Sequence, residues 1–233
     1  MIDLQGYGMS LLDGAVLTVQ AALTSAVVAI VLGMAGATAK LSRSAIARGV
    51  AEVYTTLIRG VPDLVLMLLV FFGGQMLVNQ MASLVGYEDY IDISPFIAGV
   101  GTIGFIFGAY MTENFRGAIL AVPAGQLEAG HAFGMSPRLV FLHILVPQMI
   151  RHALPGFGNN WLVLLKTTAL LSVLGLDDLL RKAGLAAGAT REPFTFYMTV
   201  AGIYLLLTTV SVAVLGWLER RYNVAYARST HGP

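Results

Sequence analysis

Residues 11–39 have the sequence LLDGAVLTVQAALTSAVVAIVLGMAGATA, which contains a single charged side chain, Asp13. An α-helix crosses the hydrocarbon core of a bilayer with about 20 mostly apolar residues. This segment is therefore long and apolar enough to form a membrane-spanning helix. Further segments of the same character follow it at Val53–Met81, Pro95–Leu120, Asn159–Leu176 and Phe194–Trp217. The sequence thus predicts an all-α integral membrane protein with five transmembrane helices.

The composition supports a membrane protein and excludes several other classes. Of the 233 residues, 57% are hydrophobic and 12% are charged, and the mean hydropathy is +0.76, whereas soluble domains contain about 25% charged residues. Continuous apolar runs leave no polar faces for a soluble surface and lack the alternation of a β-barrel. The net charge of +1 argues against a nucleic-acid-binding surface, and the lack of cysteine excludes disulfides and thiolate sites. We expect residues 1–233 to form one transmembrane domain.

Basic residues in the connections predict the orientation in the membrane, because Lys and Arg are enriched on the cytoplasmic side. Lys40, Arg43 and Arg48 follow the first predicted span, whereas residues 82–94, after the second span, carry only acidic charges. The segment after the third span and the C-terminal tail are again basic, and only the connection after the fourth span is mixed. This distribution predicts that the N-terminus lies outside the cell and the C-terminus inside.

Residues 121–158 form a connection far longer than two neighbouring helices need. Pro123 suits the start of one short helix that stops at Gly134, and Ser136 suits the cap of a second helix. Pro147 is expected to interrupt or kink that second helix. This cytoplasmic segment is either a docking surface for a partner or a pair of amphipathic helices lying on the membrane. The pattern alone leaves both interpretations open.

Ionisable side chains inside the predicted spans are costly, and they mark functional sites by default. They are Arg59, Asp63, Glu113, Arg116 and Lys166. A helix rise of about 1.5 Å per residue places them in one layer in the inner half of the bundle. Two interpretations remain open. These charges pair with one another and lock the helices, or Glu113 receives the cationic group of a substrate.

Polar residues near this layer are further candidates to line a transport pathway. They are Tyr110, Thr167, Thr168 and Ser172, although the last three hydroxyls could instead bond to carbonyls of their own helix. Residues 99–104 match the dinucleotide-binding fingerprint, but they lie inside a predicted span, where close helix packing explains the glycines. The histidines lack metal-ligand spacing and no nucleophile motif occurs, so we expect neither a metal site nor a catalytic site.

The segment 121–158 also carries a motif that resembles the EAA loop of ABC importer permeases. The spacing of that loop is matched throughout, with Gly130 and Val146 in place of alanine and leucine. The motif positions are Glu128, Ala129, Gly130, Gly134, Ile144 and Pro147. Residues 54–62, 109–117 and 165–170 are similar to signature segments of polar amino acid permeases. The resemblance covers nearly the whole chain, and it points to the Q-type permeases for histidine, lysine, arginine, ornithine and opines.

This resemblance implies a type I importer permease with the MetI-like fold, in which Glu128–Pro147 is the coupling helix for an ATPase. The implied partners are a second, M-type permease, an ATPase dimer that binds ATP and Mg²⁺, and a periplasmic amino-acid-binding protein, at a bacterial inner membrane. The chain itself would bind no cofactor and catalyse no reaction. It would couple ATPase closure to alternating access during import of cationic amino acids. Neutral or acidic polar amino acids, a homodimer of permeases and an ATP-independent secondary carrier remain alternatives.

Overall fold

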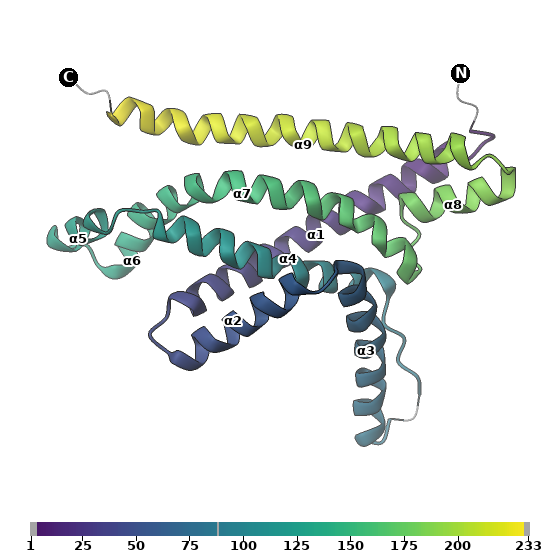
Figure 1. Cartoon of the computed structure of the whole chain (residues 1–233), viewed down its shortest axis with the longest axis horizontal. Helices are drawn as coiled ribbons and strands as arrows, with labels where there is room; N and C mark the ends of the chain where they lie inside the picture. Colours follow the sequence, from purple (N-terminus) through teal and green to yellow (C-terminus); the bar gives the residue numbers. More distant parts are fainter. Residues whose placement is uncertain (1–3, 88, 231–233) are drawn as a thin grey trace.

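Figure 1 shows the computed structural model, which describes residues 4–87 and 89–230, with side chains described as far as Tyr222. All regular elements within these residues are helical, so the all-α prediction is confirmed. In chain order they are α1 (Gly8–Leu41), α2 (Ala45–Gly60), α3 (Asp63–Leu84), α4 (Pro95–Leu120), α5 (Ala124–Ala132), α6 (Pro137–Val140), the π-helix η1 (Phe141–Leu145), α7 (Val146–Thr167), the 3₁₀-helix η2 (Thr168–Leu174), α8 (Leu179–Thr190) and α9 (Pro193–Thr230).

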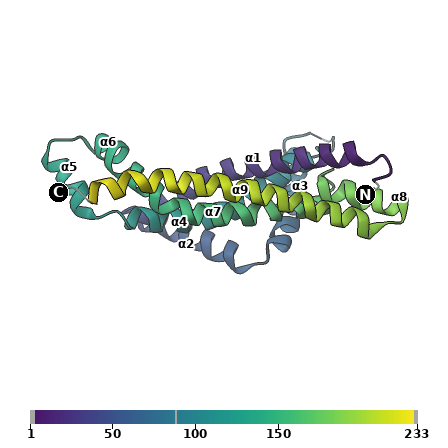
Figure 2. The ribbon, with the colours of Figure 1, turned by 90° about the horizontal axis from the view of Figure 1, so that it is seen from above.

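The helices form an elongated bundle with two different ends. α1, α4, α7 and α9 run side by side along the long axis of the molecule (Figure 1). α5 and α6 lie at the end where α9 finishes, and α8 lies at the opposite end, beside the start of α1 (Figure 2). α3 leaves this bundle and projects to one side (Figure 1).

The centre of the bundle is the close contact between α1 and α4. Glycines on each helix face side chains on the other, so the two backbones approach closely. A Cβ atom at Gly33 would overlap Met111, and one at Gly104 would lie 2.5 Å from Val28 Cγ1. The buried residues of α1 are small, being mostly alanine, glycine, serine and threonine. α4 instead contributes large fully buried side chains, namely Ile103, Ile106, Phe107 and Met111.

Within the described residues, four helices are long and apolar enough to cross a membrane, namely α1, α3, α4 and α9, so the expected count of five is wrong by this measure. The fourth expected span, Asn159–Leu176, falls on the second half of α7 and on η2. α7 begins earlier, at Val146, and carries polar side chains such as His152 along its length. After Thr167 the chain tightens into the 3₁₀-helix. Neither part is therefore a long apolar helix.

The second expected span, Val53–Met81, is also interrupted. α2 ends at Gly60 and α3 begins at Asp63, and Val61 between them is extended, with φ −112° and ψ 140°. The cause is Pro62, because a proline disfavours helical geometry at the residue before it and lacks a backbone N–H. As a result α2 stays beside α1 and α4, whereas α3 turns away from α1 and keeps its contact with α4.

The segment 121–158 contains the two short helices that its prolines and glycine indicate. α5 follows Pro123 and ends at Ala132, and Gly134 adopts a positive φ of +79° just beyond it. Ser136 caps α6 by accepting a hydrogen bond from the backbone N–H of Leu139. The interruption expected near Pro147 is the π-helix η1, after which α7 continues without a break to Thr167.

A second, smaller core lies at the end that holds α8, and it consists of Leu11, Leu179, Ala183, Ala186, Ala187, Phe196 and Val200. Beside it, Asp178 caps α8 by accepting the Arg181 N–H with Oδ1 at 2.9 Å. Asp178 Oδ2 is buried and has no hydrogen-bond partner among the residues that the structure describes. This burial raises the pKa of the Asp178 carboxyl to about 6.

We predict that Gly33→Ala destabilises the bundle. The added Cβ overlaps Met111, and overpacking of this kind costs about 1–3 kcal/mol. Gly101→Ala on α4 is the matched control, because its Cβ meets nothing within 4 Å and alanine favours the helix. Thermal unfolding in detergent should show a lower Tm for Gly33→Ala alone. Equal Tm values for both variants would contradict the close contact.

We also predict that Asp178→Asn removes a pH dependence of stability. Because the pKa of the folded state, about 6, lies above the unfolded value of 3.8, the protonated carboxyl favours folding. That contribution is complete below about pH 4 and is lost as the pH rises through about 6. Asparagine keeps the helix cap but does not ionise. As the pH rises between those values, the Tm of the native protein should fall relative to that of Asp178→Asn. Parallel curves of Tm against pH for the two proteins would refute the prediction. Asp177→Asn, at a side chain 65% exposed, is the control.

Candidate translocation face and coupling segment

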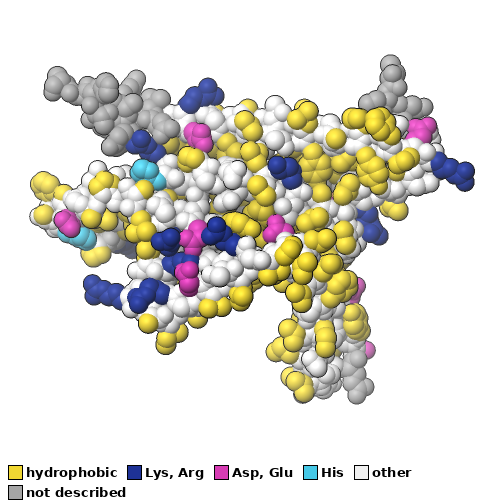
Figure 3. All heavy atoms as spheres, viewed as in Figure 1, with side chains coloured by type: hydrophobic (Ala, Val, Ile, Leu, Met, Phe, Trp, Pro, Cys, Tyr) yellow, Lys and Arg dark blue, Asp and Glu magenta, His cyan; other side chains and the backbone are white. Residues whose placement is uncertain are grey.

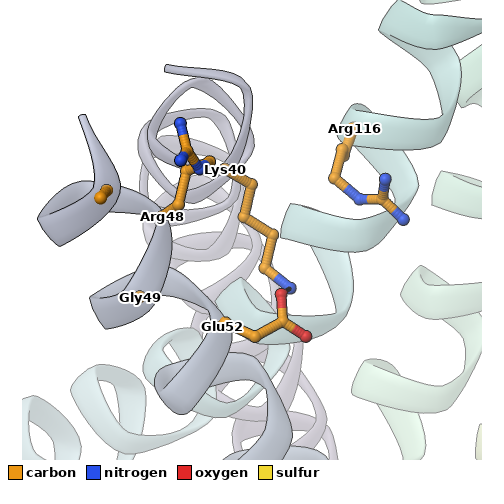
Figure 4. A pocket seen from close by; sticks show the side chains of 6 residues that line it. Lys40, Arg48, Gly49, Glu52 and Arg116 are labelled. Atoms are coloured by element: carbon orange, nitrogen blue, oxygen red, sulfur yellow. Dashed lines mark ion pairs between the residues drawn. The ribbon is translucent and has the colours of Figure 1, made fainter. Parts of the chain in front are cut away.

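A cluster of four charged side chains joins α1, α2 and α4. Lys40 Nζ lies 2.7 Å from Glu52 Oε2 and 2.5 Å from Glu113 Oε1, and Arg116 Nε lies 3.0 Å from Glu113 Oε2. Figure 4 shows Lys40 extending toward Glu52, with Arg116 on the neighbouring helix. The Lys40 side chain is only 6% exposed, and Glu113 is 22% exposed. Both carboxylate oxygens of Glu113 are therefore occupied by cations of this chain.

The sequence identified half of this cluster. Glu113 and Arg116 are neighbours on one helix face, at spacing i and i+3, and both were predicted. Lys40 and Glu52 were missed because Lys40 was assigned to the basic connection and Glu52 lay outside every expected span. One signal was present. Lys40 follows an apolar run directly, so an added turn of helix places it beside the bundle.

The other predicted charges do not join this cluster. Arg59 lies over the ring of Tyr110, with 5.6 Å between the guanidinium carbon and the ring centroid. Asp63 begins α3, and Lys166 is exposed in the last turn of α7. Arg59, Asp63 and Lys166 have no ion-pair partner among the side chains described. Figure 3 shows Lys, Arg, Asp and Glu gathered over α2 and α4 on one face of the molecule.

The predicted hydroxyl residues bond to their own helix. Thr167 Oγ1 donates to Val163 O at 3.1 Å, Thr168 Oγ1 to Leu165 O at 2.7 Å, and Ser172 Oγ to Ala169 O at 2.7 Å. Thr168 is fully buried and Thr167 nearly so. In this conformation these groups stabilise the end of α7 and the 3₁₀-helix η2, and the two threonines do not line an open surface.

In the candidate coupling segment, residues 121–158, the short helices pack on one another. Gly130 is buried, and a Cβ there would lie 2.6 Å from Ile144 Cδ1, so glycine at this motif position lets η1 pack on α5. Glu128 and Ala129 are exposed. Phe133 is 90% exposed, although the sequence analysis gave it no role. An exposed aromatic ring at a helix end is typical of an interface anchor.

Comparison with known proteins agrees with this architecture. Residues 19–224 match the family model for the binding-protein-dependent transport system inner membrane component. The chain is 51% identical, over 97% of its length and 99% of the relative's, to the histidine/lysine/arginine/ornithine transport system permease protein HisQ of Salmonella typhimurium. It is 43% identical to the octopine transport system permease protein OccQ of Rhizobium radiobacter, over 93% of this chain and 91% of that one.

Solved structures give the same result. A crystal structure of an amino acid ABC transporter with histidines matches with a TM-score of 0.78 and 30% identity, covering 95% of this chain and 99% of the other. An inward-facing structure of the MetNI methionine ABC transporter shares the fold, with a TM-score of 0.70 and 18% identity over 91% of this chain and 95% of that one.

These observations define a membrane permease with the all-helical MetI-like fold of ABC importers. The chain belongs to the family of binding-protein-dependent transport system inner membrane components. Its resemblance to amino acid permeases is confirmed. It is accordingly a transport subunit and not the enzyme of the transporter.

Proposed function

We propose that this chain is one permease subunit of an ATP-driven importer for cationic amino acids, with histidine, lysine, arginine, ornithine or related opines as substrates. The observation that carries this proposal is the identity of 51% over nearly the whole chain to a permease whose name gives the first four substrates. The octopine and nopaline permeases among its relatives, at 43% and 48% identity, support the same class.

The unpaired charges give this proposal a physical basis. Exposed ionisable groups between the ends of a membrane bundle are not stable against lipid, so they face a partner or a water-filled pathway. Arg59 and Lys166 are exposed in this position, and Asp63 is half-buried. A cationic amino acid carries an α-carboxylate as well as a cationic group, so a face with both signs of charge suits it. We place the pathway on this face, together with Tyr110, and a second permease subunit across it.

The remaining assembly follows from the two ends of the bundle. We place the end with α5 and α6 in the cytoplasm, which puts the C-terminus inside and the N-terminus outside, in keeping with the basic connections. Residues 1–233 form a single permease domain, within which residues 121–158 dock on an ATPase dimer. That dimer holds ATP and Mg²⁺, whereas this chain holds no cofactor. An amino-acid-binding protein delivers substrate at the end with α8, and the complex resides in the bacterial inner membrane.

In the proposed coupling mechanism, residues 121–158 transmit movement of the ATPase to the bundle. Closure of the ATPase dimer on ATP moves the segment and, through α7, shifts the bundle so that the pathway opens outward and accepts substrate. Hydrolysis by the ATPase then resets it toward the cytoplasm. The chain contributes movement and a polar surface, whereas the bond chemistry belongs to the partner.

We predict ATP-dependent uptake of labelled arginine by proteoliposomes that contain the co-purified complex. Unlabelled lysine, histidine and ornithine should compete, whereas glutamine and glutamate should not. Competition by glutamine or glutamate would support an importer of neutral or acidic polar amino acids instead. Uptake without ATP would overturn the importer assignment in favour of a secondary carrier.

We predict that Gly134→Val uncouples ATP hydrolysis from transport. The φ of +79° at Gly134 is strained for a β-branched residue, so the turn between α5 and α6 shifts. Gly134→Asn is the matched control, because asparagine tolerates this conformation. The valine variant should assemble and hydrolyse ATP but lose most uptake, and the asparagine variant should keep it. Normal uptake by Gly134→Val would show that the geometry of this turn is not needed for coupling.

A further inference from the structure

The helix α2 is less buried than α1 and α4, the two helices on which it packs. It buries only Ala51, Thr55 and Ile58. Its N-terminal end follows the turn between α1 and α2, and its C-terminal end meets the break at Val61 and Pro62, so the helix is hinged on both sides. An element with few buried contacts opens at low free energy. α2 is therefore a part of the bundle that can move relative to α1 and α4.

A cavity of about 520 Å³ lies beside the first turns of α2. It is lined by Lys40, Ala45, Arg48, Gly49, Glu52 and Arg116, which come from α1, α2 and α4. Figure 4 shows Gly49, Arg48 and Glu52 on one side of this space and Arg116 on the other, with Lys40 reaching from α1 to Glu52. The cavity leaves room for the N-terminal half of α2 to move relative to α4.

Besides Arg59 over Tyr110 in its last turn, two polar contacts hold α2. Near the middle, the Tyr54 hydroxyl donates to Phe105 O at 2.5 Å, and its ring packs on Phe105 with 4.9 Å between centroids. Two residues earlier is Glu52, which forms the ion pair with Lys40. Beyond Glu52 toward the N-terminus, Arg48 Nη1 donates only to Ser42 O and Arg43 O in the adjoining turn. Tyr54 is thus placed to act as the pivot and Glu52 as the point of release.

The ion-pair cluster is asymmetric in a way that favours this release. Lys40 is nearly fully buried but also pairs with Glu113, which in turn pairs with Arg116. Glu52 has Lys40 as its ion-pair partner and is 68% exposed. If α2 moves away, Glu52 passes into water, where it is already mostly hydrated, while Lys40 and Glu113 remain paired. No buried charge loses its last partner, so the opening is inexpensive.

We propose that the N-terminal half of α2 is a gate segment at the coupling end of the bundle, and that Lys40 is the positioning residue that sets its closed position by holding Glu52. This proposal rests on the importer function but not on the identity of the substrate. Lys40 acts through Glu52 on the position of α2, and Glu113 keeps Lys40 in place when the gate opens.

The test is a distance measurement by electron paramagnetic resonance on the whole transporter. Nitroxide labels are placed at Gly49→Cys on α2 and Gly117→Cys on α4, because an added Cβ at either position meets nothing within 4 Å. The chain has no cysteine of its own, and cysteines of the partner subunits are replaced. We expect one narrow distance peak without nucleotide, and a shifted peak after trapping with ATP and vanadate.

Variants of Lys40 and Glu52 decide the role of the ion pair. Lys40→Met and Glu52→Gln should broaden or shift the nucleotide-free peak. Lys40→Arg, which keeps the charge, should show the same peak as the native protein. Lys182→Met is the matched control, because Lys182 lies 4.0 Å from Asp13 at the opposite end and should leave the peak unchanged. If Lys40→Met fails to assemble, Glu52→Gln decides, since its side chain is largely exposed.

The outcomes separate this proposal from the proposed substrate. A native peak in Lys40→Met and Glu52→Gln would overturn the role of Lys40. An identical distance in both nucleotide states of the native protein would overturn the gate. Neither result depends on which amino acid is imported, so a failed arginine uptake assay with a shifted peak would reject the substrate and retain the gate.

Discussion

The close contact between α1 and α4 determines most of this structure. Gly33 and Gly36 on α1 lie against Met111 and Thr112 on α4, so the relative register of the two helices is defined by backbone contact. Lys40 follows Gly36 by four residues and therefore lies on the same face one turn later. Its partner Glu113 is adjacent to Thr112. The partly buried ion pair between Lys40 and Glu113 is thus a consequence of glycine packing, and a shift of one helix along the other would separate its charges.

Local features were predictable from the sequence, and those that depend on tertiary contacts were not. Pro123, Gly134 and Ser136 indicated the helices of the coupling segment, because caps and positive φ depend on neighbouring residues alone. Glu113 and Arg116 were found together because helix geometry places them on one face. The partner Lys40 comes from another helix 73 positions away, and nothing local to either residue indicates that contact.

The errors in the span assignments have a similar cause. Hydropathy is averaged over a window, so Val53–Met81 and Asn159–Leu176 were each taken as one helix. The first is divided at Pro62, and this break was predictable, because proline disfavours helical geometry at the residue before it. The second begins inside a longer helix, because α4 packs on α7, where Asn114 Nδ2 donates to Ala153 O at 3.0 Å. Packing against a neighbour carries the helix through Pro155, which sequence patterns alone place at a boundary.

α7 explains how a surface at one end of the bundle can influence the other. It is continuous with η1, which packs on α5 through Ile144 and Gly130, so displacement of the coupling segment acts directly on the start of α7. At its far end the helix tightens into η2 and stops at Gly175, whose φ of 90° admits the turn toward Asp178 and α8. Departures from α-helical geometry at both ends let the middle part of α7 move as a unit. Because Asn114 bonds this middle part to α4, its movement is passed to the same helix that carries Glu113 and Arg116.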